Sequence, residues 1–204
     1  MTSDERLDRL ESIDEIRQLV AKYCLALDMR DLDALVGLFP EDVRVGGGER
    51  GRAALKRWFD DTLRLQFTGT AHVTGNHIVE LESRDAARGL VYSRNEHETG
   101  DEWVVMTMLY WDRYERIDGR WLFRRRLPLY WYATDQNAPP IGANKMRWPD
   151  REPYEGGYHD FFPSWREFWA SDYDSGRDVA PPAPLGEFLA RMRPDERGAS
   201  VRVR

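Results

Sequence analysis

The sequence predicts an α+β fold in which N-terminal helices pack on one face of a curved antiparallel sheet. Two observations lead to this expectation. Apolar residues recur at helical spacing in the first third of the chain, and the pattern changes to a period of two from about residue 71 onward. Helices followed by a run of strands joined by short turns are typical of helices gathered on one face of a meander sheet.

The first helix is expected to begin at a capping box, in which Ser12 caps the helix and Glu15 reaches back to it. Apolar residues then recur every three or four positions as far as Leu27. We expect this helix to end between residues 28 and 30.

Two further helices follow. Asp31 can cap a short helix over 32–39. A brief strand over 42–45 and a glycine-rich loop over 46–51 then lead to a third helix over 52–65.

Four strands are expected after the helices, because apolar and polar residues alternate and turn signals separate the segments. The strongest of these signals is Asp118-Gly119, a typical two-residue hairpin loop. The expected strands cover 71–81, 87–98, 102–117 and 120–133.

The character of the chain changes at about residue 135. We expect residues 1–134 to form the α+β domain and residues 135–204 to form an aromatic- and proline-rich arm that wraps its own domain or a neighbour. Short helices are expected in the arm at 163–170 and 185–193. The aromatic content of the arm argues against simple disorder.

Composition excludes several classes of protein. The apolar fraction is 41% and the charged fraction 32%, as in soluble globular proteins, and the formal net charge of −6 argues against a nucleic-acid partner. No apolar run is long enough to cross a bilayer, and the acidic start lacks the apolar core of a secretion signal. Cys24 is the single cysteine, so no intrachain disulfide can form. We expect a cytoplasmic protein without a membrane partner.

No pattern for a metal or cofactor is present. The four histidines are scattered, there is no H-E-x-x-H, and the loop 46–51 lacks the spacing and the strand–helix context of a dinucleotide-binding loop. We therefore expect no metal and no cofactor.

Three segments carry a family resemblance: 13–39, 68–81 and 114–126. Together they resemble the SnoaL-like branch of the nuclear transport factor 2-like superfamily, over roughly residues 9–134. The resemblance implies a cone-shaped α+β barrel.

The resemblance also implies site residues. Asp28 and His72 match the Asp–His pair of the hexachlorocyclohexane dehydrochlorinases, and with Tyr23 they match the Tyr, Asp and His of the bile acid 7α-dehydratases. His72 and His97 resemble the two strand histidines of the scytalone dehydratases. All three groups are cofactor-free lyases. The aromatic arm resembles a longer subgroup that includes the sphingomonad diarylpropane lyases, which remove formaldehyde from a lignin-derived diaryl diol.

The chemistry of Asp28 and His72 fits a proton-transfer site. Histidine is neutral near pH 7 and can accept a proton, while a carboxylate on its other ring nitrogen fixes the tautomer. The alternative is a satisfied sheet histidine beside a polar residue at a helix end. Tyr23 lies about 140° from Asp28 around an ideal helix, so it fits core packing as well as proton donation.

Other residues are weaker candidates. Strand parity allows His97 to face the pocket as a second acid, with exposure near the turn at Gly100 as the alternative. It gives His77 the opposite parity to His72, which predicts a structural role for His77. Arg126 could polarise a leaving group or anchor a phenolate, with surface ion pairing as the alternative.

Trp111, Tyr130 and Tyr132 are candidate walls of a cavity for an aromatic substrate, with core packing as the alternative. We therefore expect a cofactor-independent lyase that acts on a small apolar or aromatic substrate, by dehydration or by retro-aldol type C–C cleavage such as deformylation of a diaryl diol. An isomerase of the ketosteroid type and a non-catalytic ligand-binding or assembly domain remain alternatives. The outer face of the sheet needs cover, which predicts a homo-oligomer, either a dimer or a trimer.

Overall fold

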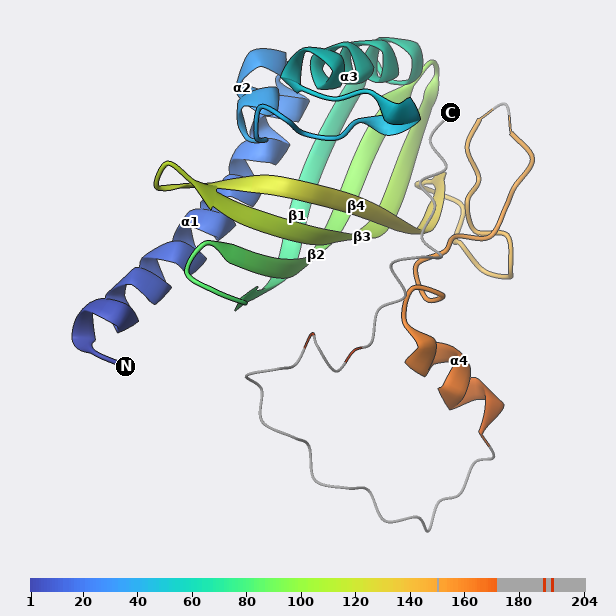
Figure 1. Cartoon of the computed structure of the whole chain (residues 1–204). Helices are drawn as coiled ribbons and strands as arrows, with labels where there is room; N and C mark the ends of the chain where they lie inside the picture. The colour runs from blue at the N-terminus through green and yellow to red at the C-terminus, as the bar shows by residue number, and fades with distance from the viewer. Residues whose placement is uncertain (150, 172–188, 190–191, 193–204) are drawn as a thin grey trace.

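The computed structural model describes residues 1–149, 151–171, 189 and 192. Four long strands form one antiparallel sheet in the order β1-β2-β3-β4, and helices α1 to α3 pack on one side of it (Figure 1). The predicted α+β fold is confirmed. The elements in chain order are α1 (Ser3–Asp28), α2 (Leu32–Gly37), a short 3-10 turn (Gly46–Gly48), α3 (Arg52–Gln66), β1 (Gly69–Leu81), β2 (Ala86–Thr99), β3 (Glu102–Ile117), β4 (Arg120–Asp135) and α4 (Pro163–Ala170).

Helix α1 begins ten residues earlier than the sequence predicted. Its capping box is formed by Thr2 and Glu5, whose side chains and backbone N–H groups bond reciprocally at 2.6 and 3.2 Å. Ser12 lies inside the helix, where its hydroxyl donates to the carbonyl of Asp8 at 2.7 Å. The prediction of a cap at Ser12 is wrong, because the Glu, Arg and Leu residues before it are good helix formers that extend the helix past the motif.

The remaining N-terminal elements follow the predictions with one exception. The side chain of Asp31 caps α2 by accepting from the N–H of Ala34 at 3.0 Å. The expected strand over 42–45 is absent, since the structure forms only an isolated antiparallel bridge between Arg44 and Arg50 there. The hairpin turn is confirmed: both Asp118 and Gly119 have positive φ, 50° and 76°, as a type I′ turn requires.

Three extra residues interrupt the regular pairing of the strands. Between Thr74 and His77, β1 contains one residue more than the facing part of β2. Strand β4 carries single extra residues at Arg124 and at Trp131, opposite continuous segments of β3. Each such bulge reverses the alternation of side chains along its strand, because the side-chain period is two.

The molecule has two apolar cores, one on each face of the sheet. The inner core joins α1, α2 and α3 to the concave face, and includes Ile16, Leu35, Val91 and Phe123. The outer core consists of sheet residues and residues of the C-terminal arm: Leu90, Leu109, Trp111, Leu127, Leu129, Tyr158, Phe161, Phe162 and Leu189. The arm therefore covers the outer face of its own sheet.

A close backbone approach holds the start of the arm on β4. Met146 bridges Ala133 and Tyr154, and the N–H of Tyr158 donates to the carbonyl of Tyr130 at 3.0 Å. A Cβ atom on Gly156 would lie 2.2 Å from that same carbonyl oxygen, so only glycine allows this approach.

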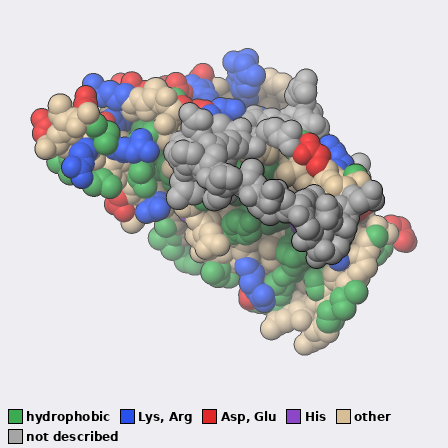
Figure 2. Space-filling view, turned by 90° about the horizontal axis from the view of Figure 1, so that it is seen from below, with side chains coloured by type: hydrophobic (Ala, Val, Ile, Leu, Met, Phe, Trp, Pro, Cys, Tyr) green, Lys and Arg blue, Asp and Glu red, His purple; other side chains and the backbone are tan. Residues whose placement is uncertain are grey.

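Helix α4 projects from the body of the molecule (Figure 1) and buries none of its residues. Its exposed rings are Trp165, Phe168 and Trp169, and Figure 2 shows hydrophobic side chains gathered on the face that α4 occupies. The helix expected over 185–193 lies outside the described residues, apart from positions 189 and 192. None of the helices in the described part of the chain has the length and apolar character needed to cross a membrane.

Candidate active site

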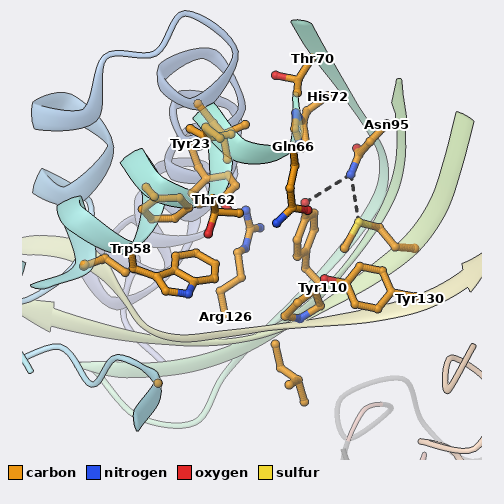
Figure 3. A pocket seen from close by; sticks show the side chains of 18 of the residues that line it. Tyr23, Trp58, Thr62, Gln66, Thr70, His72, Asn95, Tyr110, Arg126 and Tyr130 are labelled. Carbon is orange, nitrogen blue, oxygen red and sulfur yellow. Dashed lines mark hydrogen bonds between the residues drawn. The ribbon is translucent and has the colours of Figure 1, made fainter. Parts of the chain in front are cut away.

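A cavity of about 1080 Å³ lies between α3, the concave face of the sheet and the first part of the arm. Most of its wall is apolar or aromatic, with Trp58 and Phe59 from α3, Tyr110 and Tyr130 from the sheet, and Trp148 from the arm. Figure 3 shows Trp58, Thr62 and Gln66 along one side of α3, facing Arg126 and the tyrosines. Ligand cavities commonly combine an apolar wall with a few convergent polar groups in this way.

His72 lines this cavity and forms a pair with Asp28 behind it. The Nδ1 atom of His72 lies 2.6 Å from Oδ1 of Asp28, and the backbone N–H of His72 donates to Oδ2 at 2.8 Å. The hydroxyl of Thr70 donates to Oδ1 at 2.8 Å. The two side chains are only 6% and 13% exposed.

The surroundings of Asp28 keep it ionised. Burial acts to raise its pKa, but the hydrogen bonds from the ring and backbone of His72 and from Thr70 outweigh burial, and the pKa is lowered. Asp28 is the last residue of α1, where the negative end of the helix dipole disfavours a carboxylate. The three hydrogen-bond donors offset this unfavourable interaction. An Nδ1–H group of His72 donates its hydrogen bond to the carboxylate of Asp28. In the neutral ring the free lone pair is then on Nε2.

The turn that follows α1 supports the pair. Arg30 has a positive φ of 59°, and its guanidinium donates to Thr70 at 2.7 Å and to the carbonyl of Leu27 at 2.9 Å. Arg30 thereby fixes the hydroxyl that bonds Asp28. A non-glycine residue in this conformation costs free energy, so the surrounding contacts must hold it there.

His97 lines the cavity beside His72, with ring centroids 5.9 Å apart. It is 4% exposed, and it packs against Phe67 and Trp148 at 4.7 and 5.5 Å between centroids. Burial, followed by the nearby His72, lowers the pKa of His97 to about 3. The ring is therefore neutral, and its Nδ1 is a buried polar atom without a hydrogen-bond partner among the described residues. This environment fits a polar contact to a ligand better than proton donation from a charged imidazolium.

Arg126 lies at the other polar end of the cavity and is held by Asp112. Its Nε and Nη2 donate to the two carboxylate oxygens of Asp112 at 3.0 and 2.8 Å. The side chains are 4% and 0% exposed, so this is an interior pair and not the surface pair that was the alternative. Burial acts to lower the pKa of Arg126, but Asp112 outweighs it and the pKa is raised.

The third nitrogen of Arg126 is available to a ligand. Its Nη1 is buried and has no hydrogen-bond partner among the residues that the structure describes. The guanidinium lies over the rings of Tyr110, Tyr23 and Phe123, with its carbon 4.0, 4.3 and 4.4 Å from their centroids. Figure 3 shows the group pointing into the cavity, close to Gln66 and Thr62.

Tyr23 belongs to the Arg126 end. It packs edge-on against Phe39, Phe59, Tyr110 and Phe123, and burial raises its pKa to about 12, partly offset by Arg126. The phenol is therefore protonated and acts in its neutral form, not as a phenolate. The helix angle that separates Tyr23 from Asp28 places them in different parts of the site.

Of the three predicted cavity walls, only Tyr130 lines the cavity. The prediction is wrong for Trp111, which lies in the outer core against Phe161 at 5.3 Å between centroids. It is also wrong for Tyr132: the bulge at Trp131 pairs Tyr130 with Met108 but Tyr132 with Thr107, and so turns Tyr132 to the outer face.

The parity argument for His77 fails for the same reason. The bulge between Thr74 and His77 brings His77 to the inner face with His72, and its Nε2 lies 3.2 Å from the hydroxyl of Tyr114. Tyr114 donates to Asp112 at 2.9 Å. Burial lowers the pKa of His77 to about 4, so the ring is neutral. His77 does belong to the polar interior, although it does not line the cavity.

Sequence reasoning missed Asp112 and Asn95. Counting back from the Asp118-Gly119 turn would pair Asp112 with Arg125, and only the bulge at Arg124 brings it opposite Arg126. Asn95 stands opposite His72 and lines the cavity, with Nδ2 bonded to the sulfur of Met108 at 2.9 Å. Asn95 lies two residues before His97 on the same strand, so the sequence already indicated that the two side chains share a face of the sheet.

A family model described as a SnoaL-like domain matches residues 8–127. The chain belongs to the SnoaL-like domain family. Comparison with curated protein sequences finds no match. In the described residues, no group of three His, Cys, Asp or Glu side chains could hold a metal ion.

Solved structures resemble this SnoaL-like domain over most of their length. A protein named LinA is 26% identical, with a TM-score of 0.60, over 66% of this chain and 99% of its own. A hexachlorocyclohexane dehydrochlorinase, LinA-type3 from Novosphingobium barchaimii, is 22% identical, with a TM-score of 0.59, over 67% and 98%. A protein described as a scytalone dehydratase from Novosphingobium aromaticivorans is 24% identical, with a TM-score of 0.56, over 71% and 97%. These similarities establish the cone-shaped fold of the nuclear transport factor 2-like superfamily.

Proposed function

We propose that the protein is a cofactor-independent lyase in which His72, oriented by Asp28, is the general base. The observation that carries this proposal is the 2.6 Å contact between Nδ1 of His72 and Asp28, in the wall of a cavity of about 1080 Å³. It meets the geometric condition for a base and its orienting carboxylate. The described residues give Nε2 of His72 no hydrogen-bond partner, so this nitrogen can take a proton from a bound molecule.

The polar groups divide the reaction between two ends of the cavity. His72 takes a proton from a carbon or a hydroxyl of the substrate, and the released electron pair forms a C=C or C=O bond. The group that leaves departs with its bonding electrons, and Nη1 of Arg126 stabilises the charge that develops there while the neutral phenol of Tyr23 can supply a proton. Dehydration and retro-aldol cleavage both follow this scheme.

The lining of the cavity favours an apolar, aromatic substrate. Trp58, Tyr110, Tyr130 and Trp148 offer ring faces and edges on several sides, while His97 offers a neutral polar contact. The structural neighbours include proteins described as a dehydratase and a dehydrochlorinase, both of which name eliminations. Assembly into a dimer or trimer remains a prediction.

The proposal is tested by turnover on diaryl 1,3-diols and on polyketide-derived β-hydroxy ketones, followed through the absorbance of the new conjugated bond. For any compound turned over, His72→Ala should lower kcat by about 10²–10⁴-fold, the usual contribution of a general base, and Asp28→Asn should lower it with little change in KM. His159→Ala is the matched control, since His159 does not line the cavity. Unchanged turnover in a folded His72→Ala protein would overturn the mechanism.

A further inference from the structure

Arginines crowd the wall of the cavity. Besides Arg126, six of them line it, whereas Asp42 is the single carboxylate that lines it among the described residues. The chain as a whole has a formal net charge of −6, so this concentration of positive charge runs against its overall composition. The six are Arg44, Arg50, Arg113, Arg124, Arg125 and Arg151.

Four of these arginines stand in directly opposed pairs. Arg44 and Arg50 face each other across the isolated bridge that leads into α3, and Arg113 faces Arg125 across β3 and β4. Like charges directly opposite one another on paired strands are destabilising. Arg113 is already paired with Glu82 at 3.6 Å, so the excess of positive charge that an anion would relieve centres on Arg44 and Arg50.

Arg44 and Arg50 are the more available of the two pairs. Both residues are exposed, and the described residues give neither side chain a hydrogen bond or an ion pair. Their segment is fixed in place by its neighbour Asp42, which accepts from Arg124 at 2.8 Å, while Arg124 also pairs with Glu115. Asp42 is thus already engaged by Arg124, the extra residue of one of the two β4 bulges.

We propose that the arginines at the cavity mouth, with Arg44 and Arg50 at their centre, bind an anionic group of the ligand, either a carboxylate or a phosphate. The aromatic part of the same molecule lies inside the cavity. Guanidinium groups bind both anions through paired N–H donors, and a concentration of one charge at a cleft also speeds the arrival of an oppositely charged ligand. That this ligand is the substrate rests on the function proposed above; the anion site itself does not.

The test compares three probes that share one ring system: 2-naphthoate, 2-naphthyl phosphate and the neutral 2-naphthamide. Binding is measured by calorimetry and by the fluorescence of the tryptophans in the wall. An anion should bind at least about tenfold more tightly than the amide at low salt, the usual range for hydrogen bonds to charged groups, and added salt should narrow the difference. The tighter of the two anions identifies the group that the site prefers.

The variant Arg44→Gln/Arg50→Gln should lose this preference without losing binding of the amide. Its matched control is Arg64→Gln/Arg94→Gln, which removes the same charge from two exposed ion pairs, with Asp60 and Glu96, outside the cavity lining. Without ligand, the Tm of Arg44→Gln/Arg50→Gln should be no lower than that of the wild type, because the substitutions remove the repulsion between the two arginines.

Equal binding of anion and amide by the wild type, or an anion preference that survives in Arg44→Gln/Arg50→Gln, would overturn the proposal. Because the binding test needs no turnover, its result does not depend on whether the lyase proposal is correct. His72→Ala should keep the anion preference even where it abolishes activity. If the preference for the anion is lost in His72→Ala but kept in Arg44→Gln/Arg50→Gln, the anion binds beside His72 and not at the arginines.

Discussion

Removing the charge of Asp112 should destabilise the protein by about 3–5 kcal/mol, the typical result of leaving one partner of a buried ion pair alone. Asp112 is fully buried and accepts three hydrogen bonds, two from Arg126 and one from Tyr114, at 3.0, 2.8 and 2.9 Å. In Asp112→Asn the guanidinium stays buried while its counter-charge is gone. The rings of Tyr23 and Tyr110 attract the cation but supply no negative charge.

The assay is urea unfolding followed by circular dichroism, with a thermal melt beside it. For a chain of this size, 3–5 kcal/mol corresponds to a fall in Tm of roughly 6–20 °C. Asp42→Asn is the control, because the Asp42–Arg124 pair is 65% and 37% exposed and exposed ion pairs contribute little to stability. The double variant Asp112→Leu/Arg126→Met removes both charges and should recover most of the loss.

Two results would refute this reasoning. A cost below about 1 kcal/mol for Asp112→Asn would mean that water in the cavity already solvates Arg126. A double variant as unstable as Asp112→Asn would mean that the loss comes from packing or from Tyr114, and not from an uncompensated charge.

Three other changes have defined outcomes. Burial lowers the pKa of His97 to about 3, so below pH 6.5 His97 binds a proton in the unfolded protein but not in the folded protein. Acidification from pH 7.5 to 5 should therefore lower the free energy of unfolding of the wild type by about 2 kcal/mol more than that of His97→Gln, as measured by urea unfolding. Gly156→Ala should release the arm and expose it to limited proteolysis, whereas Gly157→Ala, where an added Cβ meets nothing within 4 Å, should behave as wild type. Tyr130→Ala should weaken 2-naphthamide binding and Tyr132→Ala should not, as calorimetry would show; equal effects would contradict the placement of these two rings.

Local signals in the sequence predicted the elements well where one residue pattern has one structural meaning. Asp118-Gly119 requires positive φ at both positions, and few structures other than a tight hairpin provide it. The Asp31 cap and helix α3 follow from equally local patterns. Ser12 and Glu15 show the limit: their capping motif also fits the interior of a helix, and nothing near them in the chain tells which applies.

The candidate site was predictable where it depends on single residues and unpredictable where it depends on register. Asp28 and His72 were found because each matches a family position. The partner of Arg126 was not found, because the bulge at Arg124 shifts the pairing by one residue and makes Asp112, not Trp111, its neighbour. A one-residue shift in a strand reverses every side chain beyond it, and no local pattern in the sequence marks where it occurs.

The bulges also explain how one sheet supplies both ends of the site. The extra residue in β1 lets His72 reach Asp28 while His77 reaches Tyr114, which a regular strand would prevent. On β2, where Gly89 pairs with Val79, an added Cβ on Gly89 would lie 2.8 Å from the ring of Tyr114 and 3.1 Å from Nε2 of His77, so the contact needs glycine there.

A line of polar contacts then crosses the interior from β1 to β4, through His77, Tyr114 and Asp112 to Arg126. Bulges are frequent beside active sites because they re-aim side chains. Here the bulges lie in the two outermost strands of the sheet, one in β1, which carries the proposed base His72, and two in β4, which carries Arg126. Because the two groups come from opposite edges of the sheet, its curvature is what brings both to one cavity, and any change that flattens the sheet should separate them before it unfolds the protein.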